Sequence, residues 1–234
     1  MIGCRSLTEN EINSIIGEFE KSDHPKKEKH SQRDIIIARI GLCCGYRISE
    51  ILSLKVKDCF HEDGKPRDII QVARRNMKGG KVSKKLKKGQ KQKVKNVSGR
   101  DVPVSDELKG YLSQYYQFLS SLDRNSPEEP LCYSSKTNEA LQVKPYIMLL
   151  QRTCKKLKID GKVSTHAFRK TFCNNIHKKL GNDILKTSNA MGHKSIKSTQ
   201  SYINVNHDEI QSAIKNLYKK EPLDMEMITQ VELK

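Results

Sequence analysis

The chain has 234 residues, of which 35% are hydrophobic and 30% charged, with no tryptophan. This length allows one good-sized core, or a main domain with a small satellite. A net charge of +17 at pH 7 opposes compaction unless a polyanion is near, so nucleic acid is the leading expected partner and an anionic membrane surface the alternative.

The cysteines and the N-terminus bear on the compartment. Seven cysteines form no CxxC pair, and no His/Cys spacing resembles a zinc site, so we expect reduced thiols and no metal or other cofactor. The N-terminus lacks an apolar signal region, and the most apolar stretch, DIIIARIGLCCGYRI, is interrupted by Arg39 and too short to span a bilayer. These features predict an intracellular protein that does not bind the membrane.

The first helix is predicted to begin at Thr8, where a capping box with Glu11 precedes apolar residues at helical spacing. The charged stretch KSDHPKKEKH, residues 21–30, is predicted to be a loop. Residues 31–54 then indicate a mostly buried helix, a turn near Gly45 and a second short helix.

The pattern changes after Asp58. The segments RDIIQVARR and RDVPV have β-branched, extended character and predict a small antiparallel sheet. Their connection, Arg74 to Arg100, contains twelve Lys or Arg and no acid. It is either a solvated loop or a docking segment for DNA phosphates, each of which releases a counterion when neutralised. The candidate DNA-binding residues in it are Arg74, Arg75, Lys81, Lys84, Lys85, Lys87 and Lys88.

The rest of the chain is predicted to be helical, in segments that cover residues 105–122, 141–159, 164–181, 183–192 and 206–220. Ser105 caps the first of these helices, and Asn206 with Glu209 forms a capping box for the last. The fold class is therefore mainly α with a small antiparallel β-sheet (α+β), followed by an acidic tail over residues 221–234.

Three charged side chains stand out. His166 and Arg169 lie on one face of a predicted helix, in its first turn, where backbone N–H groups favour an anion. They would add a proton-transfer group and a bidentate fork for phosphate, unless they are only the polar face of a helix N-terminus. Arg47, embedded among apolar residues, either pairs with Glu50 or points to a cleft as a second guanidinium for the same anion.

Four motifs, in their order and spacing, resemble the tyrosine recombinases, also called the phage integrase family. They are LTENE, GLCCGYRISEILSLKVKD with Arg47, HAFRKTF with His166 and Arg169, and MGHKSIKSTQSYINV with His193 and Tyr202. The resemblance extends from about Leu7 to Lys220 and implies the catalytic-domain fold of that family.

The resemblance implies that Tyr202 attacks a DNA phosphorus, forms a 3′-phosphotyrosine and releases a 5′-hydroxyl. Arg47 and Arg169 would supply the positive charge that an anionic phosphodiester needs when it is cut without metal. His166 would assist proton transfer at the tyrosine, and His193 would hydrogen-bond a phosphate oxygen.

The family's general acid is a lysine in the turn between two strands, which indicates Lys78 in NMKGGK. The expected organisation is a catalytic domain over residues 1–220, with the basic hairpin insertion at about 74–100 and no separate N-terminal core-binding domain. Double-stranded DNA would be the substrate, and four protomers would assemble on two duplexes. The segment from Asn206 would dock on a neighbouring protomer, or form a local helix with a frayed tail.

These features predict a site-specific DNA recombinase or integrase of a phage or other mobile element, acting on cytoplasmic nucleoid DNA or in a host nucleus. One alternative is a type IB topoisomerase, which relaxes supercoils without synapsis, and another is a DNA-binding accessory protein that has lost turnover. A basic RNA-binding protein is disfavoured, because the aromatic residues, 6% of the chain, do not interleave with the lysines.

Overall fold

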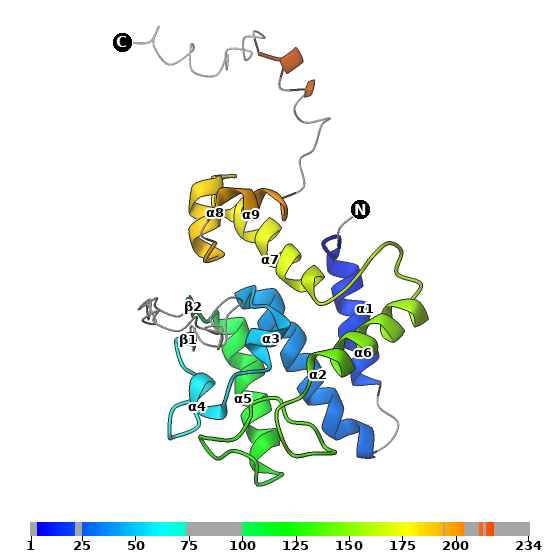
Figure 1. Cartoon of the computed structure of the whole chain (residues 1–234), viewed down its shortest axis with the longest axis vertical. Coiled ribbons are helices and arrows are strands. Elements are labelled where there is room, and N and C mark those ends of the chain that lie inside the picture. Colours follow the sequence, from blue (N-terminus) through cyan, green and yellow to red (C-terminus); the bar gives the residue numbers. More distant parts are fainter. Residues whose placement is uncertain are drawn as a thin grey trace, which may run out of the picture. The chain divides into compact units, whose positions relative to one another are not determined.

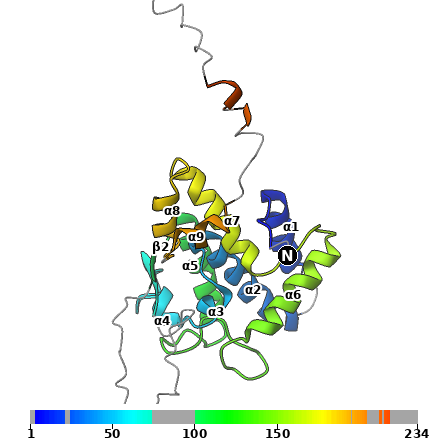
Figure 2. The same ribbon diagram turned by 45° about the horizontal axis from the view of Figure 1, so that its top comes forward.

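Helix α2, Pro25–Cys44, runs through the middle of the main unit, and α1 (Glu9–Glu20), α5 (Asp106–Ser120) and α7 (His166–Lys179) pack against it (Figures 1 and 2). Its middle is almost fully buried, including Ile36, Ile37 and Ile40. The hydrophobic core therefore forms around α2, and the chain returns to this helix from both ends of the sequence.

The computed structural model describes residues 4–21, 25–73, 100–193, 195–203, 211–212 and 214–217, without the side chains of 25–29. The chain divides into two compact units, Met1–Ile203 and Asn204–Lys234. In the second unit, residues 211–212 and 214–215 are helical, within the helix predicted over 206–220. The rest of that prediction, including its capping box, lies outside the described residues.

The remaining helices of the first unit are short, apart from α6. They are α3 (Ile48–Ile51), α4 (Val56–Cys59), α6 (Val143–Lys156), α8 (Ile184–Ala190) and α9 (Ile196–Gln200). Helix α8 packs against both α7 and α9, so the last three helices of this unit form one group.

Helix α2 begins earlier than the sequence pattern indicated. The loop predicted over residues 21–30 is wrong from Pro25 onward, where the chain is already helical. Proline suits the first position of a helix, because its φ is preset and its missing N–H would have no intrahelical partner there. The charged residues after Pro25 therefore form the first turns of a helix and not a loop.

The predicted two-stranded sheet is confirmed. Strands β1 (Ile69–Val72) and β2 (Arg100–Pro103) pair antiparallel, with Ile70 opposite Val102 and Val72 opposite Arg100. These four residues are buried, so one face of the sheet covers the core. The connection over residues 74–99 lies outside the described residues, and with it Lys78 and the seven candidate DNA-binding residues.

The fold class predicted from the sequence, mainly α with a small antiparallel sheet, is confirmed. All seven cysteines are free. None of the described helices combines the length and the apolar character that crossing a membrane requires. Within the described residues, no group of three His, Cys, Asp or Glu side chains is placed to hold a metal ion.

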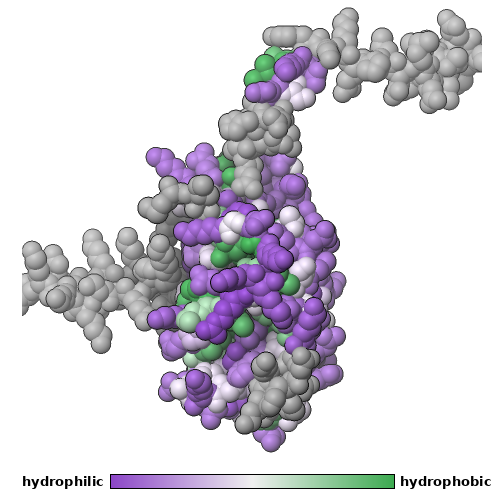
Figure 3. Space-filling model, turned by 90° about the vertical axis from the view of Figure 1, so that its right-hand side faces the viewer, coloured by the Kyte–Doolittle hydropathy of each residue, from purple (hydrophilic) through white to green (hydrophobic). Residues whose placement is uncertain are grey.

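One face of the first unit is predominantly polar. On the side that lies to the right in Figure 1, hydrophilic residues surround a smaller apolar area (Figure 3). Apolar areas of limited extent are ordinary on soluble domains and do not by themselves indicate a function.

Candidate active site

The first arginine of the site, Arg47, immediately precedes α3 and follows a turn that only glycine fits. Gly45 has φ +62°, and a β-carbon there would lie 2.3 Å from the ring of Phe172. Glu50, which is fully buried, accepts from Arg47 twice: Oε2 from the backbone N–H at 2.8 Å and Oε1 from Nη1 at 2.8 Å. The Arg47 side chain nevertheless keeps 24% of its exposure, so part of the guanidinium faces solvent.

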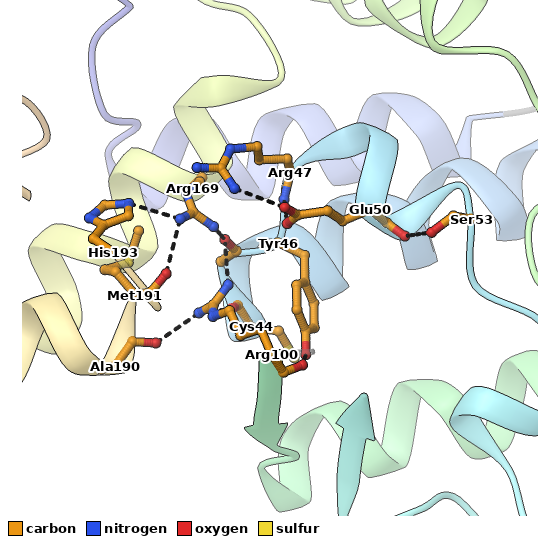
Figure 4. A network of polar contacts seen from close by, with 11 residues as sticks. Cys44, Tyr46, Arg47, Glu50, Ser53, Arg100, Arg169, Ala190, Met191 and His193 are labelled. Carbon is orange, nitrogen blue, oxygen red and sulfur yellow. Dashed lines mark hydrogen bonds and ion pairs between the residues drawn. The ribbon is translucent and has the colours of Figure 1, made fainter. Parts of the chain in front are cut away.

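The second arginine, Arg169, lies in α7 and is only 1% exposed. Its Nη1 donates to the carbonyl of Gly45, and its Nη2 donates to the carbonyl of Met191 at 3.0 Å and to Nε2 of His193 at 2.9 Å (Figure 4). Its Nε has no hydrogen-bond partner among the described residues. Arg169 thus joins the turn after α2 to the turn after α8.

A third arginine was missed by the sequence analysis. Arg100, at the start of β2, is 6% exposed and donates to three carbonyls: Gly45 at 3.2 Å, Cys44 at 2.9 Å and Ala190 at 2.9 Å (Figure 4). It binds the same two turns as Arg169, from the sheet side. The available signal was its alternation with Val102, which places both side chains on the buried face of a strand.

His193 lies between an arginine and a threonine. Its Nε2 is 2.9 Å from Arg169 Nη2, and its Nδ1 is 2.8 Å from Thr199 Oγ1 in α9. Burial, and then the charges of the three nearby arginines, lower the pKa of His193 to about 4. The ring is therefore neutral at pH 7.

Tyr202 lies two residues after the end of α9. Its ring centroid lies 5.4 Å from that of His193, with the planes inclined at 36°, and Cζ of Arg169 lies 5.8 Å from the tyrosine ring centroid. Four of the six predicted catalytic residues, Arg47, Arg169, His193 and Tyr202, therefore meet in one region of the first unit.

The site carries excess positive charge. Among the described residues, Glu50 is the only carboxylate in an ion pair with these three arginines. Burial, and then the neighbouring charges of Arg100 and Arg47, lower the pKa of Arg169 to about 10. An anion bound here would relieve the repulsion between the guanidiniums, so the arrangement suits a phosphate.

His166 is the first residue of α7, one turn before Arg169. Its side chain is exposed, whereas that of Arg169 is buried. Its predicted position in the first turn of a helix is confirmed, while its role in proton transfer remains a prediction. The roles assigned to Lys78 and to the basic residues of the hairpin also remain predictions, because those residues are not described.

The fold is that of tyrosine recombinases of known structure. XerH site-specific recombinase bound to its palindromic difH substrate superposes with a TM-score of 0.66 at 18% identity, covering 92% of this chain and 53% of that one. XerA recombinase gives a TM-score of 0.63 at 22% identity, covering 94% and 68%.

The chain belongs to the phage integrase family, whose model matches residues 5–209, and the resemblance drawn from the four motifs is thereby confirmed. Tyrosine recombinase XerA of Pyrococcus furiosus is 27% identical over 210 residues, which are 90% of this chain and 60% of that protein. The integrase of Escherichia phage 186 is 27% identical over 209 residues, covering 89% and 46%. The chain therefore spans about half to three-fifths of the length of these relatives.

Proposed function

We propose that the chain carries the active site of a tyrosine-type site-specific DNA recombinase, which cuts and rejoins DNA through a 3′-phosphotyrosine intermediate. The observation that carries the proposal is the position of Tyr202, whose ring lies beside both Arg169 and His193. A tyrosine next to a cluster of cations with a single paired carboxylate suits nucleophilic attack on an anionic phosphodiester.

In the proposed reaction, Arg47 and Arg169 donate to the non-bridging oxygens of the scissile phosphate. The phenol oxygen of Tyr202 forms a bond to phosphorus while the bond to the 5′ oxygen breaks. The phenol proton passes to His166, and Lys78 gives a proton to the departing 5′ oxygen. The phosphotyrosine keeps the energy of the broken bond, so a 5′-hydroxyl from another strand reverses the step without ATP.

The substrate and assembly follow from the same proposal. Double-stranded DNA is the expected partner, supported by the net charge of +17 and by similarity to recombinases solved on DNA. Four protomers would act on two duplexes, with residues 1–220 as the catalytic domain and the segment after Asn206 contacting a neighbour. An origin in a phage or other mobile element is supported by similarity to the integrase of phage 186.

The proposal is tested by trapping the covalent intermediate. The whole chain is incubated, with and without EDTA, with a pool of randomised duplexes nicked beside a fixed position, so that a short 5′-hydroxyl strand diffuses away after cleavage. We expect protein–DNA adducts that resist denaturation and survive EDTA, because the arginines replace the electrostatic role of a metal. Adducts that require Mg²⁺ would contradict the mechanism.

The same assay separates the alternatives. Binding of duplex DNA without any adduct would identify a non-catalytic accessory protein. Relaxation of supercoiled plasmid, with adducts but without exchange of strands between duplexes, would identify a topoisomerase-like enzyme.

A further inference from the structure

We propose that Thr199 is a positioning residue, whose hydroxyl holds the His193 ring in either neutral tautomer and which couples that ring to the segment that carries Tyr202. The inference deepens the proposed recombinase function and rests on it for its catalytic consequence. Its structural half, the hydrogen bond between Thr199 and the His193 ring, concerns only this chain and is testable without DNA.

The tautomer follows from the chemistry of the two partners of the ring. An arginine guanidinium has only donors, so Nε2 of His193, 2.9 Å from Arg169 Nη2, must accept. A neutral imidazole that accepts at Nε2 carries its proton on Nδ1. Nδ1 lies 2.8 Å from Thr199 Oγ1, which therefore accepts that proton's hydrogen bond.

Thr199 also holds the backbone that leads to Tyr202. Its side chain is fully buried in α9, and its carbonyl accepts from the N–H of Tyr202 at 2.9 Å and of Ile203 at 3.2 Å. One residue thus fixes the ring of His193 through its hydroxyl and the position of the tyrosine through its carbonyl. A shift of Thr199 would move both groups together.

The hydroxyl allows a second hydrogen-bonded state. A bound phosphate oxygen can accept the hydrogen bond that Arg169 Nη2 donates to Nε2 of His193 in the free protein. Nε2 can then hydrogen-bond the phosphate only if it carries a proton. In that state Nδ1 releases its proton to water, Nε2 gains one from water, and the ring stays neutral. Thr199 then rotates its O–H to donate to Nδ1, which a hydroxyl can do and a methyl group cannot.

A second threonine–histidine pair provides a matched control. Thr187, also fully buried, has its Oγ1 2.9 Å from Nδ1 of His177, but its own O–H donates to the Asp183 carbonyl at 2.6 Å. The hydroxyl proton of Thr187 is therefore already committed. Removal of either hydroxyl costs a buried hydrogen bond, but only Thr199 lies between His193 and Tyr202.

The structural half is tested by measuring the ¹⁵N chemical shifts of the His193 ring in the whole chain, since a protonated and a bare imidazole nitrogen resonate far apart. We expect Nδ1–H in the wild type and in Thr199→Ser, and shifted ring ¹⁵N resonances in Thr199→Val, where Nδ1–H has lost its buried acceptor. Thr187→Val should leave the His193 shifts unchanged. A wild-type ring protonated at Nε2, or an unaltered ring in Thr199→Val, would overturn the proposal.

The second state is tested with inorganic phosphate as the probe. Saturating phosphate, judged from the Arg169 side-chain ¹⁵N shifts, should move the His193 proton to Nε2 in the wild type and in Thr199→Ser but not in Thr199→Val. A wild-type tautomer that does not respond to bound phosphate contradicts this part of the inference.

The catalytic consequence is read from the rate of adduct formation at saturating DNA and, separately, from DNA affinity. Thr199→Val should slow adduct formation roughly 10-fold or more, because a preorganised donor to the phosphate is lost, with affinity nearly unchanged. Thr199→Ser should restore the rate to within about 3-fold, and equal rates for the two variants would refute the positioning role. If the wild type forms no adduct, the recombinase proposal fails, while the tautomer measurement still decides the structural claim.

Discussion

Glu50 holds Arg47 at two points, one carboxylate oxygen on its backbone N–H and the other on its guanidinium, each at 2.8 Å. The carboxylate is completely buried, whereas the arginine keeps a partly exposed face. Arg47 is therefore fixed in direction by a buried anion while part of its guanidinium remains open to a ligand.

Replacement of Glu50 by glutamine should weaken both stability and cleavage. The amide offers one acceptor where the carboxylate offers two, and it turns an N–H₂ group toward a donor. We expect a loss of about 1–3 kcal/mol in the free energy of unfolding, measured with urea, together with slower adduct formation. Glu128→Gln serves as a control, because Glu128 pairs with Lys55 and Lys57 on the surface and should change little.

Arg100→Met should show whether Arg100 supports cleavage beyond its contribution to the stability of the fold. It removes the donors to Cys44, Gly45 and Ala190, and we expect a loss of about 1–3 kcal/mol in unfolding free energy and slower cleavage by the protein that remains folded. The matched control is Arg124→Met, because Arg124 stacks on Tyr133 and donates to Asn138. That variant should lose stability but cleave normally once corrected for the folded fraction; equal effects on cleavage would contradict a role of Arg100 in the site.

A pair of glycines tests the contact between Arg100 and the turn before His193. Gly192 has φ +63°, and a β-carbon there would lie 2.9 Å from Cδ of Arg100, whereas Gly181, at φ +65°, has open space around it. Alanine at either position brings backbone strain of about 1 kcal/mol. Gly192→Ala should therefore lower the melting temperature more than Gly181→Ala and slow adduct formation as well. An equal decrease in melting temperature would mean that the Arg100 side chain moves aside at little cost.

The titration of His193 predicts a component of pH-dependent stability. Its pKa is about 4 in the folded chain, below the ordinary value of 6.5, so between these values the unfolded state binds the proton more readily. The stability that comes from keeping the His193 ring neutral in the folded state is fully present above pH 6.5 and is lost as the pH falls toward 4. Asp34, whose pKa burial raises to about 6, gives the opposite slope in this range, and it is common to wild type and variant.

Urea unfolding at pH 7 and pH 4.5 checks this prediction. His193→Gln should lose less stability than the wild type between the two values, because its side chain does not titrate. Identical pH dependence in the two proteins would show that His193 keeps an ordinary pKa.

Local sequence patterns predicted the helices and the sheet well, because the signals that start these elements act within a few residues. The Thr8 hydroxyl accepts from the Glu11 N–H and the Glu11 carboxylate from the Thr8 N–H, as the capping box requires. Ser105 likewise caps α5. The loop prediction over 21–30 was wrong because it rested on the charged residues. Pro25, which marks the start of α2, was the local signal for a helix in this segment.

The site was predictable in its residues but not in its contacts. Arg169 was expected as a fork at a helix N-terminus, yet it is buried against the Gly45 carbonyl, 124 positions earlier, and the Met191 carbonyl, 22 positions later. Arg100 ends a run of basic residues and so resembled part of a solvated segment. Partners so distant in sequence leave no local pattern, and the same is true of the hydroxyl of Thr199.

The central claim, that Tyr202 is the nucleophile, is tested most directly by locating the DNA on the protein. Adducts trapped on the nicked duplexes are digested with nuclease and protease, and the peptide that retains a nucleotide is sequenced by mass spectrometry. We predict a 3′-linked nucleotide on Tyr202, and no adduct from Tyr202→Phe although that variant binds DNA nearly as well as the wild type. A nucleotide on another residue, for which Tyr218 is the next candidate, or adducts that persist in Tyr202→Phe, would contradict it.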